Sequence, residues 1–378
     1  MRAGYPVATK SHLPHLQKYK NYGVAPEELT IPELLKPAGY RSLMVGKWHL
    51  GFNVEGSHPI DAGFDEYLGI PGNYDKKERI NNNTLYHNKT ILTENVNPKI
   101  LTTRYTDKVV SFLTEPKKEP FFIYVSHHIV HGPYVPSKEF EGSSENGDYG
   151  DFIQELDYST QRIMDALRTA QLEENTLVVF TSDNGPNWRG STGGLNGGKY
   201  CTMEGGHRVP SIFYWPNQIP AGQVSNTLIS SMDLLPLFCD LAGVDLPNDR
   251  KTDGKNILNI LKNNSTTSPH EYTYYYNGTN LQAIRKGDWK LHLPRTIEDQ
   301  PYWSRKVYKR GDKGFVTLDK HVLFNLKNDV GENTNLADEH PDVVAMLLNQ
   351  AEVIRAELGD VDVIGMDQRI PNLESPQE

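Results

Sequence analysis

The stretch GYRSLMVGKWHLGF, residues 39–52, places a lysine and a histidine directly after an apolar run. Side chains two residues apart point to the same face of extended backbone, so Lys47 and His49 would present a cation beside a titratable proton donor. This combination suits an oxyanion substrate. Because most exposed lysines are simply solvated, the pair alone would not indicate a site, and other segments have to join it.

A carboxylate and an amide follow a second apolar run, in TLVVFTSDNG at residues 176–185. Asp183 and Asn184 carry the hard oxygen ligands that Ca²⁺ or Mg²⁺ prefers, and Gly185 permits a turn that would aim both at one ion. Asp-Asn-Gly is also an ordinary turn sequence. Since Ca²⁺ takes about 6–8 oxygens, these two residues would form at most part of its ligand shell.

Three histidines, His127, His128 and His131, follow the apolar run PFFIYV. Their spacing lacks the HExxH helix of a zinc site and no carboxylate accompanies them, so zinc is not predicted. A lone histidine usually has a structural role, and we assign that role to His127.

A glycine-rich stretch, GGLNGGKYCTMEGGHRVP at residues 193–210, surrounds Lys199. Gly193 to Lys199 formally spell the GxxxxGK of a nucleotide-binding loop. However, Tyr200 replaces the Ser or Thr that would bind magnesium, and polar loop rather than an apolar strand precedes the glycines. We therefore reject nucleotide binding and expect the glycines to allow close backbone approach around Lys199.

The order of predicted elements indicates an α/β sheet with parallel strands, whose carboxyl ends would carry the site. Residues 61–86 read as polar loop. Beyond a boundary at residues 263–270, short strands suggest an antiparallel meander, covered by a helix at residues 340–358. The predicted helices are 30–36, 103–115, 149–171, 232–241 and 257–261, and the predicted strands include 42–45, 120–128, 175–185, 211–215, 272–277, 281–287 and 289–293.

Length and charge narrow the function classes. The 378 residues suffice for one large and one smaller domain, and no run approaches the roughly 18 apolar residues of a membrane helix. A net charge of -9 argues against general nucleic-acid binding. Such a chain can bind a sulfate or phosphate ester only where local cations or a metal reverse the potential. Cys201 and Cys239 are too few for a disulfide framework and read as unpaired thiols.

Residues 39–52 closely resemble the second signature of the formylglycine-dependent sulfatases, the arylsulfatase A-like branch of the alkaline phosphatase superfamily. The His-x-x-His and GK…EGG stretches resemble the family too, and the likeness covers nearly the whole chain. It implies an alkaline phosphatase-like, mostly parallel sheet flanked by helices in residues 1–262, and a smaller antiparallel α+β domain in residues 263–378. It also implies hydrolysis of a sulfated carbohydrate or aryl sulfate ester, in the periplasm, the extracellular space or the lysosome, without a nucleic acid or a membrane span.

The resemblance assigns roles residue by residue. It implies catalytic roles for Lys47, His49, His131 and Lys199, substrate binding by Asn73 and His128, and Ca²⁺ or Mg²⁺ ligation by Asp183 and Asn184. For His128, orientation of the loop is the alternative to substrate contact.

One part of the family pattern is absent from this sequence. In the family, a Cys-x-Pro-Ser-Arg motif that becomes formylglycine and an aspartate pair precede residue 39, and neither occurs here. Cys201 precedes Thr-Met-Glu and Cys239 precedes Asp-Leu-Ala, so neither fits the motif. We expect the chain as given to be inactive, and we expect upstream DNA to encode both missing features.

Two other functions stay open. A phosphodiesterase or phosphonate monoester hydrolase of the same superfamily would share the metal and histidine chemistry. A non-catalytic binder of sulfated glycans would retain the lysines and histidines without a nucleophile. Comparing the turnover of nitrophenyl sulfate with that of a nitrophenyl phosphodiester would separate a sulfatase from a phosphodiesterase. Binding of a sulfated sugar without turnover would indicate the glycan binder.

Overall fold

The computed structural model describes residues 22–74, 83–116, 118–187, 189–299, 317–361, 363–369 and 372–373. A five-stranded sheet forms the centre of the first part of the chain, in the order β5-β4-β3-β2-β6. Its middle strands, β3, β2 and β6, are parallel, whereas β4 and β5 run antiparallel at one side. The strands are β2 (Arg41–Lys47), β3 (Glu66–Ile70), β4 (Leu85–His87), β5 (Thr90–Thr93) and β6 (Phe121–Ser126).

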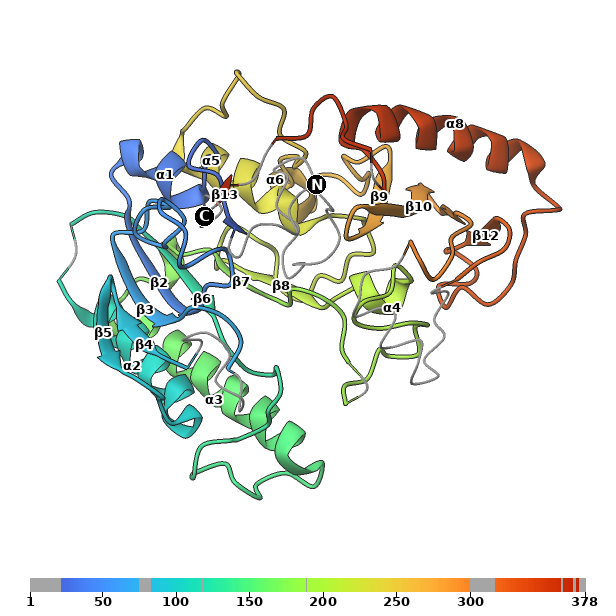
Figure 1. Ribbon diagram of the computed structural model, residues 1–378. Coiled ribbons are helices and arrows are strands. Elements are labelled where there is room, and N and C mark those ends of the chain that lie inside the picture. The colour runs from blue at the N-terminus through green and yellow to red at the C-terminus, as the bar shows by residue number, and fades with distance from the viewer. Residues whose placement is uncertain are drawn as a thin grey trace, which may run out of the picture.

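Helices cover both faces of this sheet, as predicted (Figure 1). On one face, α2 (Leu101–Thr114) and α3 (Gly147–Thr169) pack together and enclose the largest apolar cluster with β2 and β3. On the other face, Phe238 of α5 (Leu234–Ala242) lies against Phe122 of β6, with ring centroids 5.8 Å apart. Helix α1 (Ile31–Leu35) packs beside α5. The sheet is therefore the middle layer of an α/β/α arrangement.

Helix α1 begins where its sequence predicts. The hydroxyl of Thr30 accepts a hydrogen bond from the backbone N–H of Glu33, while the Glu33 carboxylate accepts from the Thr30 backbone N–H, a capping box. Pro32 occupies the first turn, where no N–H is required. The short 3₁₀ segment η2 (Lys36–Ala38) follows and leads into β2.

A second, separate pair of strands continues the chain. β7 (Val178–Thr181) pairs antiparallel with β8 (Ser211–Tyr214), and α4 (Glu204–His207) lies between them in sequence. Among the described residues, β6 has a strand neighbour only in β2, and β7 only in β8. Tyr124 of β6 is consequently 46% exposed and Phe180 of β7 36% exposed.

The C-terminal part is an antiparallel sheet covered by one long helix, as predicted (Figure 1). The apolar side of its strands packs against α8 (Pro341–Leu358). α6 (Leu258–Leu261) precedes this part, and β1 (Tyr22–Gly23) pairs with β13 (Asn372–Leu373), joining the two ends of the described chain. The sheet consists of β9 (Thr273–Asn277), β10 (Asn280–Lys286), β11 (Trp289–His292) and β12 (Val322–Asn325).

Two sequence-based expectations were wrong. Residues 61–86 were predicted to be loop, yet they contain β3, which is buried and central. Its five residues end in Gly-Ile before a Pro-Gly turn, so the turn signals hid a short strand. The apolar run at β7 was predicted to be buried, but Phe180 and Thr181 are exposed because β7 pairs only with β8 among the described residues. In the described parts of the chain, every helix is too short or too polar to span a bilayer.

Candidate active site

The first site segment is the end of β2. The strand ends at Lys47, and His49 has a left-handed backbone with φ 58°, so the extended geometry predicted to align the two side chains stops before His49. Two hydrogen bonds hold the turn instead, from the N–H of Trp48 to the Ile70 carbonyl (3.1 Å) and from the N–H of His49 to the Pro71 carbonyl (2.8 Å). The carboxyl end of β3 therefore positions the histidine.

Gly46 is required where β2 passes between its neighbours. Its φ is 107°, and a Cβ there would lie 1.9 Å from the carbonyl oxygen of Ser126 on β6. Trp48 anchors the same turn, since its indole is buried and donates to the Ser57 carbonyl at 2.8 Å. The glycine and tryptophan of the GKWH motif thus have structural roles, and they leave Lys47 and His49 for chemistry.

Asn73 lies beside Lys47. The Lys47 ammonium donates a hydrogen bond to the Asn73 side-chain oxygen at 3.2 Å. The contact fixes the lysine near the loop after β3.

The histidine segment after β6 divides into interior and site residues. His128 is 5% exposed, and its ring meets Tyr105 and Phe152 edge-on, at centroid distances of 5.8 and 6.3 Å. Burial lowers its pKa to about 3. This location favours the loop-orienting role over substrate contact for His128. His127 lies 3.4 Å from the Ser159 hydroxyl, which fits the structural role assigned to it.

His131 lies close enough to Lys199 and Lys47 for their charges to lower its pKa. One of its ring nitrogens, Nδ1, lies 2.7 Å from the Gly132 carbonyl and would donate its proton there. That hydrogen bond selects the tautomer in which the second nitrogen, Nε2, is an acceptor until the ring takes up a proton.

The Asp183 loop and the Lys199 segment are tied together through their backbones. The N–H of Lys199 donates to the Pro186 carbonyl (2.8 Å), and that of Gly185 donates to the Gly206 carbonyl (2.9 Å). A Cβ on Gly185 would lie 1.9 Å from the Gly205 carbonyl oxygen. The glycines on both segments thus permit the close approach that the sequence predicted around Lys199.

Charge interactions show that these segments meet. Burial lowers the pKa of Lys47, with the Asp183 carboxylate opposing this shift and the Lys199 ammonium adding to it. Burial likewise lowers the pKa of Lys199, again opposed by Asp183.

The histidines respond to the same charges. Burial, followed by the charge of Lys47, lowers the pKa of His49 to about 4. Burial and then Lys199 lower the pKa of His131. Two lysines, two histidines and one aspartate from separate segments therefore form one cluster, in which the imidazoles are neutral at pH 7.

Asp183 and Asn184 fit a hard cation by ligand type but do not complete its shell. Across the part of the chain that the structure describes, no three His, Cys, Asp or Glu side chains gather closely enough to hold a metal ion. Ca²⁺ would need several further oxygens. The described residues alone therefore do not make the predicted metal site.

Sequence reasoning missed the buried ionic cluster behind the Lys199 segment. Lys290 of β11 is fully buried, and its Nζ lies 3.0 Å from carboxylate oxygens of both Glu204 and Glu332. His292 contacts Glu332 at 2.7 Å, and the Glu204 backbone N–H donates to the second Glu332 oxygen at 2.6 Å. The partners are separated by 86 and 128 residues, so only the alternation of Lys290 and His292 on one strand face could have indicated them.

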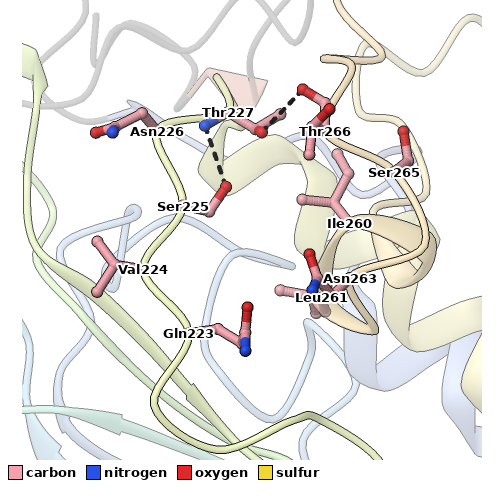
Figure 2. Close-up of a pocket in the computed structure, with 10 residues that line it drawn as sticks. All are labelled: Gln223, Val224, Ser225, Asn226, Thr227, Ile260, Leu261, Asn263, Ser265 and Thr266. Carbon is pink, nitrogen blue, oxygen red and sulfur yellow. Dashed lines mark hydrogen bonds between the residues drawn. The ribbon is translucent and has the colours of Figure 1, made fainter.

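A separate pocket lies between the loop after β8 and the segment around α6 (Figure 2). It has a volume of about 380 Å³, and the Thr227 hydroxyl donates across it to the Thr266 carbonyl at 3.1 Å. Its walls share no residue with the cation cluster and carry no charged side chain, so it is unsuited to an anion. It is lined by Gln223, Val224, Ser225, Asn226, Thr227, Ile260, Leu261, Asn263, Ser265 and Thr266.

This chain is similar to known sulfatases. An arylsulfatase of Hemicentrotus pulcherrimus is 37% identical, over 89% of this chain and 67% of its own length. The N-acetylgalactosamine-6-sulfatase of Homo sapiens is 38% identical over 72% of this chain, and the match spans 55% of that protein.

Solved structures agree as well. A structure described under glycosaminoglycan metabolism by Bacteroides thetaiotaomicron has a TM-score of 0.78 at 26% identity, covering 90% of this chain and 84% of that one. Residues 8–244 match the sulfatase family model, and residues 268–368 match the model for the C-terminal region of aryl-sulfatase. The chain therefore belongs to the sulfatase family.

Proposed function

We propose that the protein containing this chain hydrolyses sulfate esters of sugars or aryl alcohols, and that Lys47, Lys199, His49 and His131 bind the sulfuryl group. One observation carries the proposal: these four side chains share a cluster with Asp183 in a chain of net charge -9. A local group of cations is what an anionic ester requires on such a protein.

The lysines would bind the anion and the histidines would move the proton. Two ammonium groups stabilise negative charge on the sulfuryl oxygens, most strongly as it builds up in the transition state. An imidazole with a pKa near 4 is neutral at pH 7, but a bound anion would raise that pKa and allow the ring to protonate the leaving oxygen. His49, whose pKa Lys47 helps to depress, is the residue we assign to this step.

The nucleophile and the remaining metal ligands would come from polypeptide outside the described residues. Cys201 and Cys239 are both buried, which argues against either as a nucleophile. Within the described ranges, β6 and β7 each have one side without a strand neighbour, and that side would accept a further strand. In the family, a formylglycine would supply the nucleophile and a divalent cation would polarise the ester. We also propose a periplasmic, extracellular or lysosomal location, from the family resemblance.

Turnover by the complete gene product tests the proposal. We expect hydrolysis of 4-nitrophenyl sulfate, and we expect Lys199→Ala and Lys47→Met each to lower kcat/KM at least about 100-fold. Lys89→Ala is the control, because that exposed lysine pairs with Asp61 at 2.6 Å, outside the cluster.

Three results would count against sulfate ester hydrolysis. Faster cleavage of bis(4-nitrophenyl) phosphate would identify a phosphodiesterase. Salt-sensitive binding of a sulfated sugar without any turnover would identify a glycan binder. If Lys199→Ala and Lys89→Ala changed kcat/KM equally, the cation cluster would have no part in the reaction.

A further inference from the structure

Tyr200 occupies a backbone conformation that suits glycine. The N–H of Cys201 donates to the Gly198 carbonyl at 3.0 Å, which closes a four-residue turn with Tyr200 at its third position. The φ of Tyr200 is 77°, as in a type II turn, where that position favours glycine or asparagine. A tyrosine is strained there, although the chain has glycines at positions 197 and 198, separated from Tyr200 only by Lys199.

Contacts from three directions hold the strained turn. The Asn277 side-chain amide, from β9, donates to the Tyr200 carbonyl at 3.0 Å. On one side of the turn, the Lys199 N–H is bound to Pro186, and on the other the buried Thr202 hydroxyl donates to Gln282 at 3.0 Å. The surrounding structure therefore enforces the conformation of Tyr200.

The tyrosine ring lies beside the cation cluster and remains open to solvent. The Lys199 ammonium is 5.5 Å from the centroid of the Tyr200 ring, within the range of a cation–π contact. The side chain is nevertheless 39% exposed. A strained, partly exposed aromatic residue at the edge of a site indicates a functional constraint rather than a packing one.

We propose that Tyr200 is a specificity-determining residue, whose ring stacks on the sugar ring that carries the sulfate ester. This inference rests on the proposed function, because it places the sugar next to a sulfuryl group held by Lys199. An aromatic face within 5.5 Å of that ammonium can contact the organic part of the ester while the ammonium binds its anionic part.

The test compares binding of two anions by the complete gene product. We use N-acetylgalactosamine 6-sulfate and inorganic sulfate as probes, measure dissociation constants by calorimetry, and record the melting temperature of each variant. Tyr200→Gly should weaken binding of the sulfated sugar about 10-fold, the size of a stacked aromatic contact, and change binding of inorganic sulfate less than about twofold. Its melting temperature should stay the same or rise, because glycine relieves the strain.

Two further variants separate stacking from backbone strain. Tyr200→Phe keeps the ring and should bind the sulfated sugar within about threefold of wild type. Gln171→Gly relieves a left-handed residue, φ 58°, at the end of α3, and should change stability without changing either affinity.

The results distinguish the two proposals. If Tyr200→Gly still binds the sulfated sugar as wild type does, or loses affinity for the sugar and for inorganic sulfate alike, the role of Tyr200 is overturned. The proposed function is not affected by either result. Wild-type protein that binds neither anion overturns the proposed function as well.

Discussion

Replacing Lys290 by methionine should destabilise the protein more than any surface lysine substitution. Lys290 projects from the face of β11 opposite α8, is fully buried, and contacts Glu204 and Glu332 at 3.0 Å each. Methionine has a similar length and fills the space, so the substitution removes mainly the charge. Two buried carboxylates would then lose their shared cation.

The expected loss can be worked from these distances. At 3.0 Å and an effective dielectric constant of about 20, each contact contributes roughly 5 kcal/mol of attraction, much of it offset by desolvation. Removing one partner of a buried pair costs about 3–5 kcal/mol in practice. For 378 residues, with an unfolding entropy of about 2.1 cal/mol/K per residue, this lowers the melting temperature by about 5 °C.

Thermal and urea unfolding of the wild-type protein and of Lys290→Met measure this loss of stability. Lys286→Met is the matched control. Lys286 lies on the neighbouring strand β10 and pairs with Glu271 at 3.0 Å, but its side chain is 36% exposed. Its replacement should lower the melting temperature far less than Lys290→Met does, because solvent screens an exposed ion pair.

A loss in Lys290→Met as small as in the control would refute the importance of the buried cluster. A second result would do the same. In the triple variant Lys290→Met/Glu204→Gln/Glu332→Gln these three charges are removed together, and Arg285, which lies 3.6 Å from Glu204, keeps 13% of its side chain exposed to water, so the variant should recover stability relative to Lys290→Met. A triple variant less stable than the single one would show that lost packing, rather than an uncompensated charge, sets the cost.

Three further predictions concern other parts of the molecule. Burial lowers the pKa of His49 to about 4 and that of His128 to about 3, so below pH 6.5 the unfolded chain binds more protons than the folded chain. The free energy of unfolding, measured with urea, should therefore fall as the pH drops from 6.5 toward 3. His128→Phe should make this fall less steep, and an unchanged slope would contradict the prediction. Gly46→Ala should prevent correct folding, seen as loss of near-ultraviolet circular dichroism, because its Cβ would lie 1.9 Å from the Ser126 carbonyl; a native spectrum would contradict it. Thr30→Ala should cost about 1 kcal/mol in urea unfolding through loss of the α1 cap, and no change would show that the cap contributes nothing.

Elements with strong local signals could be predicted from the sequence. The helices α2, α3 and α8 have long amphipathic patterns, and β2 and β6 are apolar runs between clear boundaries. The antiparallel arrangement of β9 to β11 followed from short strands separated by turn residues. Boundaries agreed to within a few residues, since caps and prolines mark them.

Features that depend on tertiary partners could not be predicted. β3 is short and ends in turn residues, so only its pairing with β2 identifies it as a central strand. His49 has a left-handed backbone because the chain turns after β2 and is held by hydrogen bonds to the end of β3, which the alternation of side chains along a strand cannot indicate. The motif nevertheless drew attention to Lys47 and His49, because their chemistry is visible without the geometry.

The Glu204, Lys290 and Glu332 cluster shows the same limit more clearly. Each residue is ordinary in its local sequence, and the contact exists only when the C-terminal sheet packs against the Lys199 segment. Apart from the alternation of Lys290 and His292 on one strand face, no local spacing reveals these long-range ion pairs.

Among the residues that the structure describes, β6 pairs only with β2 and β7 only with β8, and this has a consequence for handling the protein. The other side of each strand has no described strand beside it, and Tyr124 and Phe180 are exposed nearby. Unpaired strand edges attract strands from other molecules. Concentrated solutions of this polypeptide should therefore form intermolecular β-structure, and a synthetic peptide that occupies these edges should keep the solution clear.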